Sequence, residues 1–246
     1  MRIAILTSGY APVLDGVAVS VETRVRRLAG AGHEVLLMAP RPAADPGPPP
    51  GLPDTVRFAG LPSARFGDAA GDLNPLPAAR PVMHAALAGF GPQVIHVDEP
   101  ERLALGMRCL PALAFARRRG RVAGRACGSR RGVPAVAFFH TNFVDYPGQS
   151  RPALLPWLAP MRVAGLSLLA QLYNRYDATL VPSTATLGRL RRCGLANGIA
   201  GAFNGADTQR FSPALRAPGF WGAQWGLPGL DGRRILLIAG RLTADK

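Results

Sequence analysis

The first forty residues constrain the fold more than any other stretch of the chain. An apolar run from Arg2 to Thr7 ends in turn residues and predicts a buried strand. From Val17 to Leu28 apolar residues recur at near-helical spacing. The other face of this segment carries Glu22, Arg24, Arg26 and Arg27. Glycines end the predicted helix, and a strand-like run follows from Glu34 to Ala39. This βαβ unit predicts a parallel sheet with a right-handed crossover.

The loop at residues 8–16 follows the first predicted strand. It should therefore lie at the carboxyl edge of the sheet, where open α/β folds bind ligands. Gly16 begins the predicted helix, and an anion would suit this position because unpaired backbone N–H groups and the helix dipole both point there. The alternative is that Gly16 merely fits a tight turn. No G-x-G-x-x-G pattern occurs in this stretch, which weighs against a nucleotide-dependent oxidoreductase.

Composition indicates a globular protein. The chain has 246 residues, of which 48% are hydrophobic, enough for one large domain or two modest ones. The apolar run at the N-terminus is too short for a signal peptide, and no stretch predicts a transmembrane helix. The three cysteines, Cys109, Cys127 and Cys193, are scattered and fit reduced cytosolic thiols, and their spacing does not suggest a metal site. We therefore expect a cytoplasmic protein.

The formal net charge of +14 comes almost entirely from arginine, because Lys246 is the only lysine. Such a charge favours phosphate-rich partners such as an anionic membrane surface, although biased codon composition explains it too. Residues 117–131 contain seven arginines. No aromatic residues interleave with them, so we expect no nucleic-acid partner. This segment is predicted to be an exposed loop that is either solvated or in contact with anionic lipid.

The rest of the chain alternates between strand-like and helix-like segments. Strands are predicted at residues 55–59, 93–97, 133–139, 178–181 and 199–203, and helices at 77–88, 101–119, 153–176 and 184–193, the last with Ser183 as its N-cap. Glycine and proline predict loops at 40–54 and 60–75. Prolines 156 and 160 should interrupt the apolar segment 153–176, which argues against a membrane span and leaves an interfacial role open.

Polar side chains follow two of these predicted strands. His96, Asp98 and Glu99 come at the end of one. His140, Thr141 and Asn142 come directly after the all-apolar strand 133–139. A lone histidine is usually structural, but three polar residues at the expected ligand crevice favour a binding or catalytic role.

The C-terminal part has the composition of a domain boundary. Residues 214–232 are rich in glycine and proline and predict a linker after a first domain spanning 1–213. Residues 233–239 predict a strand that begins a second domain, of which the chain would hold only 233–246. One strand cannot form a domain, so we expect a truncated protein.

With these segments placed, the sequence resembles the N-terminal half of a family 4 glycosyltransferase, a retaining enzyme of GT-B fold. The motifs that carry this resemblance are MRIAIL with its loop to Gly16, GAGHEVLLMAP at 30–40, VIHVDEP at 94–100, FFHTNF at 138–143, VPSTATLGRLRRCG at 181–194, NGADTQRFSP at 204–213 and LLIAGRLTADK at 236–246. The implied fold is α/β, a Rossmann-like doubly wound sheet that is mainly parallel.

The resemblance also implies roles for individual residues. The Gly16 loop would approach the donor diphosphate or the acceptor, and His140 would lie at the transferred sugar as the catalytic residue. Arg241 and Lys246 would bind the donor and neutralise its diphosphate as the nucleotide leaves. The acceptor side would comprise Asp15, Thr141 and Asn142. The resemblance implies no metal and no cofactor, because the nucleotide sugar, a UDP- or GDP-sugar, is a substrate.

The implied function is transfer of a sugar to a glycosyl acceptor with retention. The HTNF motif favours a lipid acceptor, and with it peripheral contact at the inner face of an anionic membrane. The family's paired glutamates, which hold the nucleotide ribose and the sugar, would lie beyond Lys246, so we expect the 246 residues alone to lack activity. The alternative is an inactive fragment or a Rossmann-like domain that binds a ligand without turnover.

Overall fold

The computed structural model describes residues 1–10, 16–42, 51–65, 73–75, 78–100, 132–140, 155–201, 205, 207–209, 211–230 and 232–236. The strands are β1 (Arg2–Leu6), β2 (Glu34–Pro42), β3 (Val56–Arg65), β4 (Leu73–Pro75), β5 (Val94–Asp98), β6 (Ala135–Phe138), β7 (Ala178–Val181) and β8 (Gly198–Ala200). The helices are α1 (Gly16–Gly30), α2 (Ala79–Phe90), α6 (Leu155–Tyr173), α7 (Thr184–Arg192), the 3-10 turn η3 (Pro213–Leu215) and α8 (Phe220–Trp225).

Within the described residues, the eight strands form one sheet in the order β4-β3-β2-β1-β5-β6-β7-β8. All neighbouring strands are parallel except β3 and the short β4. The first strand of the chain lies inside the sheet, with β2 and β3 on one side and β5 to β8 on the other. The strand order reverses between β1 and β5, which makes this the topological switch point. The predicted fold class is confirmed: an α/β, doubly wound, mainly parallel sheet.

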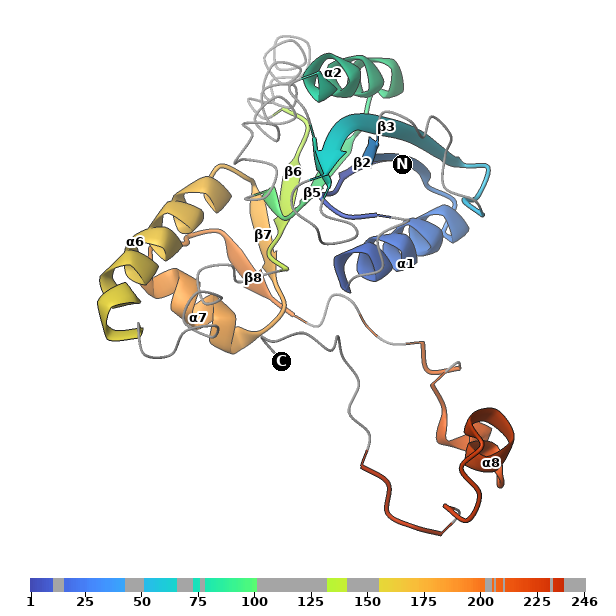
Figure 1. Cartoon of the computed structure of the whole chain (residues 1–246). Helices are drawn as coiled ribbons and strands as arrows, with labels where there is room; N and C mark the ends of the chain where they lie inside the picture. The colour runs from blue at the N-terminus through green and yellow to red at the C-terminus, as the bar shows by residue number, and fades with distance from the viewer. Residues whose placement is uncertain are drawn as a thin grey trace.

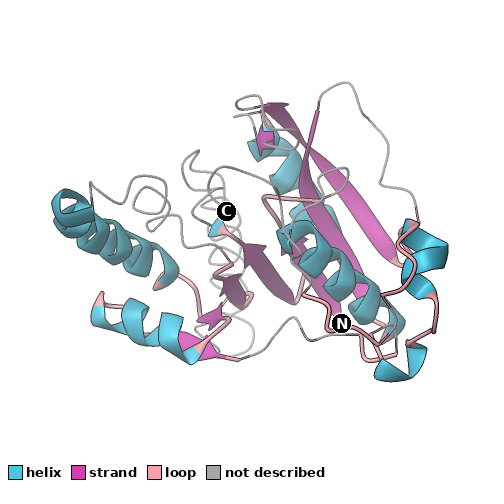
Figure 2. Ribbon diagram, turned by 60° about the horizontal axis from the view of Figure 1, so that its bottom comes forward, coloured by secondary structure: helices cyan, strands magenta, loops and turns pink. Residues whose placement is uncertain are grey.

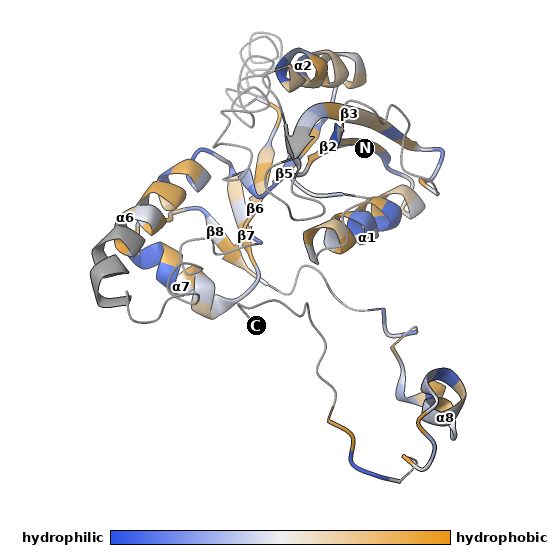
Figure 3. Ribbon diagram, in the orientation of Figure 1, coloured by the Kyte–Doolittle hydropathy of each residue, from blue (hydrophilic) through white to orange (hydrophobic). Residues whose placement is uncertain are grey.

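Helices cover both faces of the sheet (Figures 1 and 2). On one face, α1 packs against β1 and β2 through a cluster of Ile5, Tyr10, Val17, Val21, Val25, Val35, Leu37 and Ala39. On the other face, α2, α6 and α7 pack against the strands through a larger cluster that includes Met83, Leu87, Tyr173, Leu187 and Leu190. Strand residues alternate between the two clusters, which is why the strands appear in the sequence as continuous apolar runs. Figure 3 shows mainly hydrophobic residues in the central strands and a mixture of hydrophobic and hydrophilic residues along α1.

Several element boundaries follow from local residue chemistry. α1 ends at Gly30, and Gly32 adopts a left-handed φ of 80°, which glycine tolerates without a steric penalty. Ser183 caps α7 by accepting a hydrogen bond from the backbone N–H of Thr186 at 3.1 Å, as its sequence position predicts. β7 occupies the predicted residues 178–181.

Three predictions from the sequence were wrong. Both loop predictions fail in part. Residues 60–65 belong to β3, because residues 60–63 pair with β2 and residues 63–65 with β4, and residues 40–42 are the end of β2. Prolines 156 and 160 do not break α6, which runs continuously from Leu155 to Tyr173. Pro156 lies in the first turn, where a backbone N–H has no intrahelical partner, whereas Pro160 lies in the second turn and costs the helix one hydrogen bond. Residues 233–236 are not in a strand, because they pair with no described strand. The predicted helix 101–119, the segment 117–131 and residues 237–239 lie outside the described residues.

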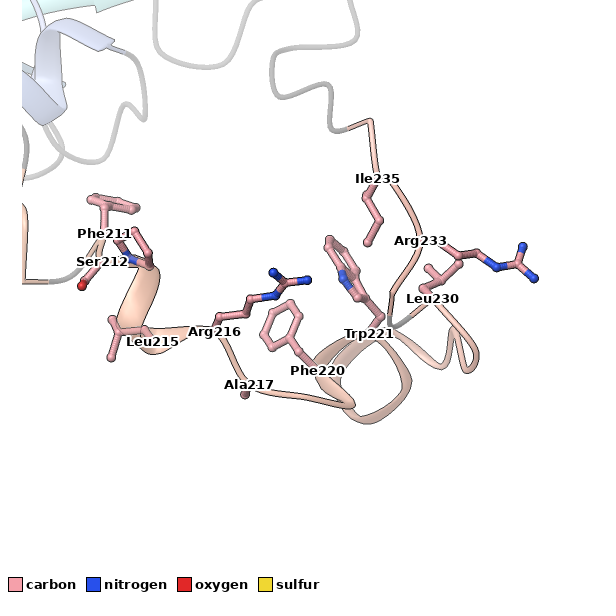
Figure 4. A pocket seen from close by; sticks show the side chains of 11 residues that line it. Phe211, Ser212, Leu215, Arg216, Ala217, Phe220, Trp221, Leu230, Arg233 and Ile235 are labelled. Carbon is pink, nitrogen blue, oxygen red and sulfur yellow. The ribbon is translucent and has the colours of Figure 1, made fainter.

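Residues 211–236 extend away from the sheet (Figure 1). The apolar side chains of this segment are exposed: Phe211 is 71% exposed, Trp225 67% and Leu236 89%. Phe220, Trp221 and Ile235 line an open groove of about 700 Å³ that belongs to this segment alone (Figure 4). Among the described helices, none has the length and apolar character needed to cross a bilayer.

Candidate active site

Three neighbouring strands bring polar residues to one edge of the sheet, on either side of the switch point. β1 ends before Thr7 and Ser8, β5 ends in Asp98 followed by Glu99, and β6 ends two residues before His140. The three strands are parallel neighbours, so their carboxyl ends lie side by side. This is the position at which doubly wound sheets bind ligands.

Asp98 is the centre of this site. Its side chain is fully buried, and its Oδ1 accepts hydrogen bonds from His140 Nε2 at 2.7 Å and from Arg24 Nη2 at 2.8 Å. Oδ2 is buried and has no hydrogen-bond partner among the described residues. Arg24 comes from α1 and keeps 19% of its side chain exposed, and its Nη1 lies 2.9 Å from Nε2 of His96. A buried carboxylate with a guanidinium and an imidazole on one oxygen is a paired charge, which is the condition for keeping it ionised.

Aromatic stacking holds the rings of the site parallel. Phe138 and His140 stack with centroids 4.0 Å apart and planes 9° from parallel. The ring of His96 lies 6.2 Å from that of Phe138, with an interplanar angle of 14°. The Arg24 guanidinium lies 5.5 Å from the centre of the Phe138 ring, within cation–π range. The orientation of the His140 imidazole is thus set both by stacking and by its hydrogen bond to Asp98.

The surroundings shift the protonation equilibria of two groups. Burial is the largest cause that lowers the pKa of His96 to about 4, and the nearby Arg24 charge acts in the same direction, although Asp98 opposes it. His96 is therefore neutral at pH 7 and can accept a hydrogen bond from Arg24. Burial alone raises the pKa of Asp98, but the Arg24 charge and the hydrogen bond from His140 outweigh it and hold the pKa well below its ordinary value. Asp98 is a carboxylate at any physiological pH.

Glu99 has an unusual backbone conformation beside this cluster. Its φ of 48° lies in the left-handed region that residues other than glycine rarely adopt, and its side chain is fully buried. Ser8 donates a hydrogen bond of 2.6 Å to Glu99 Oε2 and so ties the loop after β1 to the end of β5. Such strain, on the order of 1–3 kcal/mol, is concentrated in proteins at binding and catalytic sites.

The N-terminus of α1 lies next to the loop after β1. Gly16 is the first residue of α1, as predicted, and a Cβ built on Gly16 would meet no atom within 4 Å. Packing therefore does not require glycine there, and the space above it is open. Tyr10 is buried beneath this loop, where burial and the charge of Glu22 raise its pKa to about 12, so the phenol keeps its proton.

The structure describes only part of the predicted site, and the roles of its residues stay predictions. His140 and Gly16 are described, and His140 lies at the predicted carboxyl edge. Asp15, Thr141, Asn142, Arg241 and Lys246 lie outside the described residues. No three metal-ligating side chains gather anywhere in the described part of the chain.

The sequence analysis assigned Arg24 to the outer face of α1, and this was wrong. Arg24 reaches inward to Asp98 and His96. The spacing contained the signal, because Val17, Val21, Arg24 and Leu28 follow the i, i+4, i+7, i+11 stripe of a buried helix face. A charged residue on such a stripe requires a buried partner.

A comparison with models of protein families shows to which family the chain belongs. The family model for glycosyltransferase family 4 matches residues 14–210, which is most of the chain. The chain belongs to glycosyltransferase family 4. The matched region includes strands β2 to β8, together with Asp98 and His140.

Curated relatives agree with this family. A GDP-mannose-dependent alpha-mannosyltransferase of Mycobacterium tuberculosis is 32% identical over the whole chain, and proteins with the same name from Mycolicibacterium smegmatis and Corynebacterium glutamicum are 29% and 27% identical. The matches cover 57%, 58% and 52% of those proteins. The chain thus spans about half the length of the curated relatives it matches.

A solved structure supports the fold. Sucrose-phosphate synthase from Thermosynechococcus elongatus superposes on 92% of the chain with a TM-score of 0.60 and 18% identity, and the match covers 53% of that protein. At this identity the likeness concerns the fold alone. The family 4 domain therefore has the architecture of one half of a GT-B glycosyltransferase.

The geometry limits what each group of the site can do. Asp98 is fully buried and bonded to two cationic or hydrogen-donating neighbours, so it is placed to orient other side chains rather than to attack a substrate. His140 keeps 7% of its side chain exposed, and its Nδ1 has no hydrogen-bond partner in the described part of the chain. Arg24 is more exposed, at 19%, but its two Nη atoms contact His96 and Asp98, which leaves Nδ1 of His140 as the atom of this cluster that we consider for a ligand.

Proposed function

We propose that the protein containing this chain transfers a sugar from a nucleotide sugar to an acceptor at the carboxyl edge of β1, β5 and β6. The observation that carries the proposal is the pairing of His140 with buried Asp98 at the switch point of a family 4 domain. A histidine fixed in this way can hold the reacting sugar in one geometry, which lowers the entropic part of the barrier.

GDP-mannose is the donor we propose first, ahead of UDP-sugars. The three curated relatives named above share a GDP-mannose-dependent activity in their names. The diphosphate would approach the N-terminus of α1 at Gly16, where the positive end of the helix dipole favours an anion. Arg241 and Lys246 would neutralise the charge that develops on the leaving nucleotide, and Asp15, Thr141 and Asn142 would face the acceptor.

We propose retention of configuration at the sugar. No described carboxylate is placed as a nucleophile for a double displacement, since Asp98 and Glu99 are fully buried and hydrogen-bonded. The proposed mechanism is a front-face transfer in which the leaving phosphate takes the proton of the acceptor hydroxyl. GDP-mannose is an α-linked donor, so retention would give an α-mannoside.

We propose a lipid acceptor, with the protein in the cytoplasm and in peripheral contact with the inner face of the membrane. The net charge of +14 favours an anionic surface. α6 exposes Val163 and Leu168, which are 59% and 67% exposed, and the adjacent α7 ends in the exposed Arg191 and Arg192. Apolar side chains beside arginines are what an interfacial element requires.

The membrane proposal is tested by vesicle sedimentation. Binding to anionic vesicles should exceed binding to neutral ones and should weaken as salt rises. Leu168→Gln should lower anionic-vesicle binding several-fold, whereas Ile199→Gln, which alters an exposed residue of β8, should not. Equal binding to both vesicle types, or no binding, would remove the membrane from the account.

The transferase proposal is tested with a donor panel. The natural full-length protein should transfer from GDP-mannose faster than from other GDP-sugars and UDP-sugars, and NMR of the first product should show the α-anomer. We expect the 246 residues alone to show no transfer, since the relatives named for this activity are about twice as long. Saturable donor binding without turnover in the full-length protein would favour the ligand-binding alternative instead.

A further inference from the structure

The contacts of His140 assign different roles to its two ring nitrogens. Nε2 lies 2.7 Å from Oδ1 of Asp98, and a carboxylate can only accept a hydrogen bond. Nε2 must therefore carry the proton. In the neutral imidazole this leaves Nδ1 unprotonated, and Nδ1 has no hydrogen-bond partner in the described part of the chain.

Arg24 keeps Asp98 in the state that this arrangement needs. The guanidinium binds the same oxygen, Oδ1, that receives the His140 proton. A fully buried carboxylate without this cation would gain a proton or turn away, and either change would release His140. Arg24 is itself fixed by its contact with His96 and by its position over the Phe138 ring. The orientation of the His140 ring therefore depends on a series of contacts that begins with Arg24 on α1.

We propose that Arg24 and Asp98 are a positioning pair that holds His140 with its proton on Nε2 and presents Nδ1 to the ligand as a hydrogen-bond acceptor. The chemical class that fits Nδ1 is a hydroxyl, which can donate to it, and within the proposed function this is a hydroxyl of the sugar or the acceptor. The assignment of Nδ1 to a hydroxyl rests on the proposed function. The positioning by Asp98 does not.

The location of the pair supports a link between the two sides of the site. α1 carries Gly16 at its N-terminus and Arg24 two turns later. Arg24 donates a hydrogen bond to Asp98 at the end of β5. Asp98 also accepts a hydrogen bond from His140, which follows β6. The helix whose N-terminus is proposed to meet the diphosphate thus also orients the histidine proposed to meet the sugar. A shift of α1 would move both groups together.

Side-chain ¹⁵N NMR of the 246-residue chain tests the positioning directly and needs no substrate. We expect one neutral tautomer for His140, protonated at Nε2, with a downfield and slowly exchanging Nε2 proton. Glu99→Gln, which alters the neighbouring buried carboxyl that Ser8 binds, should leave this signal in place. A proton on Nδ1, or two tautomers in exchange, would overturn the proposal whether or not the protein transfers sugar.

Variants separate positioning from a merely structural ion pair. Asp98→Leu alone leaves Arg24 without its counter-charge and can lower stability, so the decisive variant is Arg24→Met combined with Asp98→Leu, which removes both charges and the acceptor for Nε2. We expect this double variant to fold, to lose the slowly exchanging Nε2 proton and, in the natural full-length protein, to lower kcat about 10- to 100-fold with little change in the donor KM. Asp177→Asn, at the other end of β6, is the matched control and should keep the wild-type kcat.

Each outcome decides one claim. A double variant that keeps both the Nε2 proton signal and the wild-type kcat would show that the pair is only structural, and the proposal would be wrong. If the double variant loses the Nε2 proton signal and the unaltered full-length protein transfers no sugar, the positioning is supported and the proposed function is refuted. A lost signal with an unchanged kcat would show that His140 does not use Nδ1 on the reacting molecule, which overturns the functional half of the inference.

Discussion

The carboxyl edge of β1, β5 and β6 and the segment 211–236 are opposites in burial. At the edge, Asp98 and Glu99 are charged side chains with no exposed surface. In the segment, Phe211, Trp225 and Leu236 are apolar side chains that are mostly exposed. The first arrangement persists only because each buried charge has a specific partner. Hydrophobicity alone therefore does not decide which side chains of this chain are buried, because position in the sheet and specific partners bury charged ones as well.

The segment 211–236 has little to fix its conformation. α8 is six residues long and is bounded by Gly219 and Gly226, both in the left-handed region. Its groove is formed by residues of the same segment (Figure 4). A helix of this length is not stable by itself in water, so its order depends on side chains such as Phe220 and Trp221 packing together. The edge site, in contrast, is built on strands inside the sheet.

The largest expected difference between the two regions is in stability. Asp98→Ala leaves the Arg24 guanidinium without its counter-charge, and because Arg24 keeps some solvent contact we expect a loss of about 3 kcal/mol, the low end for a broken buried pair. Trp225→Ala removes a larger side chain from an exposed position and should change the free energy of unfolding by no more than about 0.5 kcal/mol. Urea denaturation of both variants measures this. Similar losses for the two variants would break the comparison.

A smaller effect concerns pH. The pKa of His96 is lowered to about 4 in the folded protein, whereas an unfolded histidine titrates near its ordinary value of about 6.5. Between these values the unfolded chain binds the additional proton, so the free energy of unfolding should fall as pH decreases from about 6.5 to about 4. Below this range, protonation of Asp98 should lower stability further, because its pKa is also depressed.

His96→Gln sharpens this prediction. Glutamine keeps an acceptor for Arg24 but cannot titrate, so the loss of stability between pH 6.5 and pH 4 should be reduced in the variant. Trp225→Ala should retain the wild-type pH dependence, since no titratable partner of Trp225 is described. Denaturation curves at several pH values provide the measurement. A variant whose stability falls with pH as steeply as the wild type would show that His96 does not cause the effect.

The smallest expected effect is a difference in proteolysis. Chymotrypsin should cut after Phe220, Trp221 or Trp225 at least about tenfold faster than after Phe138 or Tyr173, because cleavage needs local unfolding and the sheet opens rarely. Mass spectrometry of early fragments identifies the sites. Equal early cutting within β6 or α6 would show that the edge is no better ordered than the exposed segment.

Sequence reasoning predicted the fold because its signals were local and repeated. Buried strands such as 178–181 gave continuous apolar runs, and the cap at Ser183 depends on residues three apart. It failed where tertiary pairing overrode local chemistry. Gly60 and Pro62 predict a loop, yet pairing with β2 holds them in β3. An apolar run that begins at Ile235 predicts a strand, but residues 233–236 pair with no strand in the described part of the chain.

The site was predicted less completely than the fold. His140 was found because it follows an apolar strand, and Asp98 was noted at a strand end. Their 2.7 Å contact could not be foreseen, since it depends on β5 and β6 being neighbours in parallel register. Arg24 was missed because charge on a helix usually indicates solvent. The left-handed conformation of Glu99 has no sequence signal, because glutamate rarely adopts it.

The most direct test of the account is the transfer activity of His140→Ala in the natural full-length protein, measured with GDP-mannose. We expect kcat to fall by roughly 100-fold, the usual scale for one positioned polar group, while Asp177→Asn stays at the wild-type rate. The urea midpoint of His140→Ala should change little, because the Asp98–Arg24 ion pair remains. Near-normal transfer by a folded His140→Ala protein would contradict the account, and so would a variant that loses activity only because it unfolds.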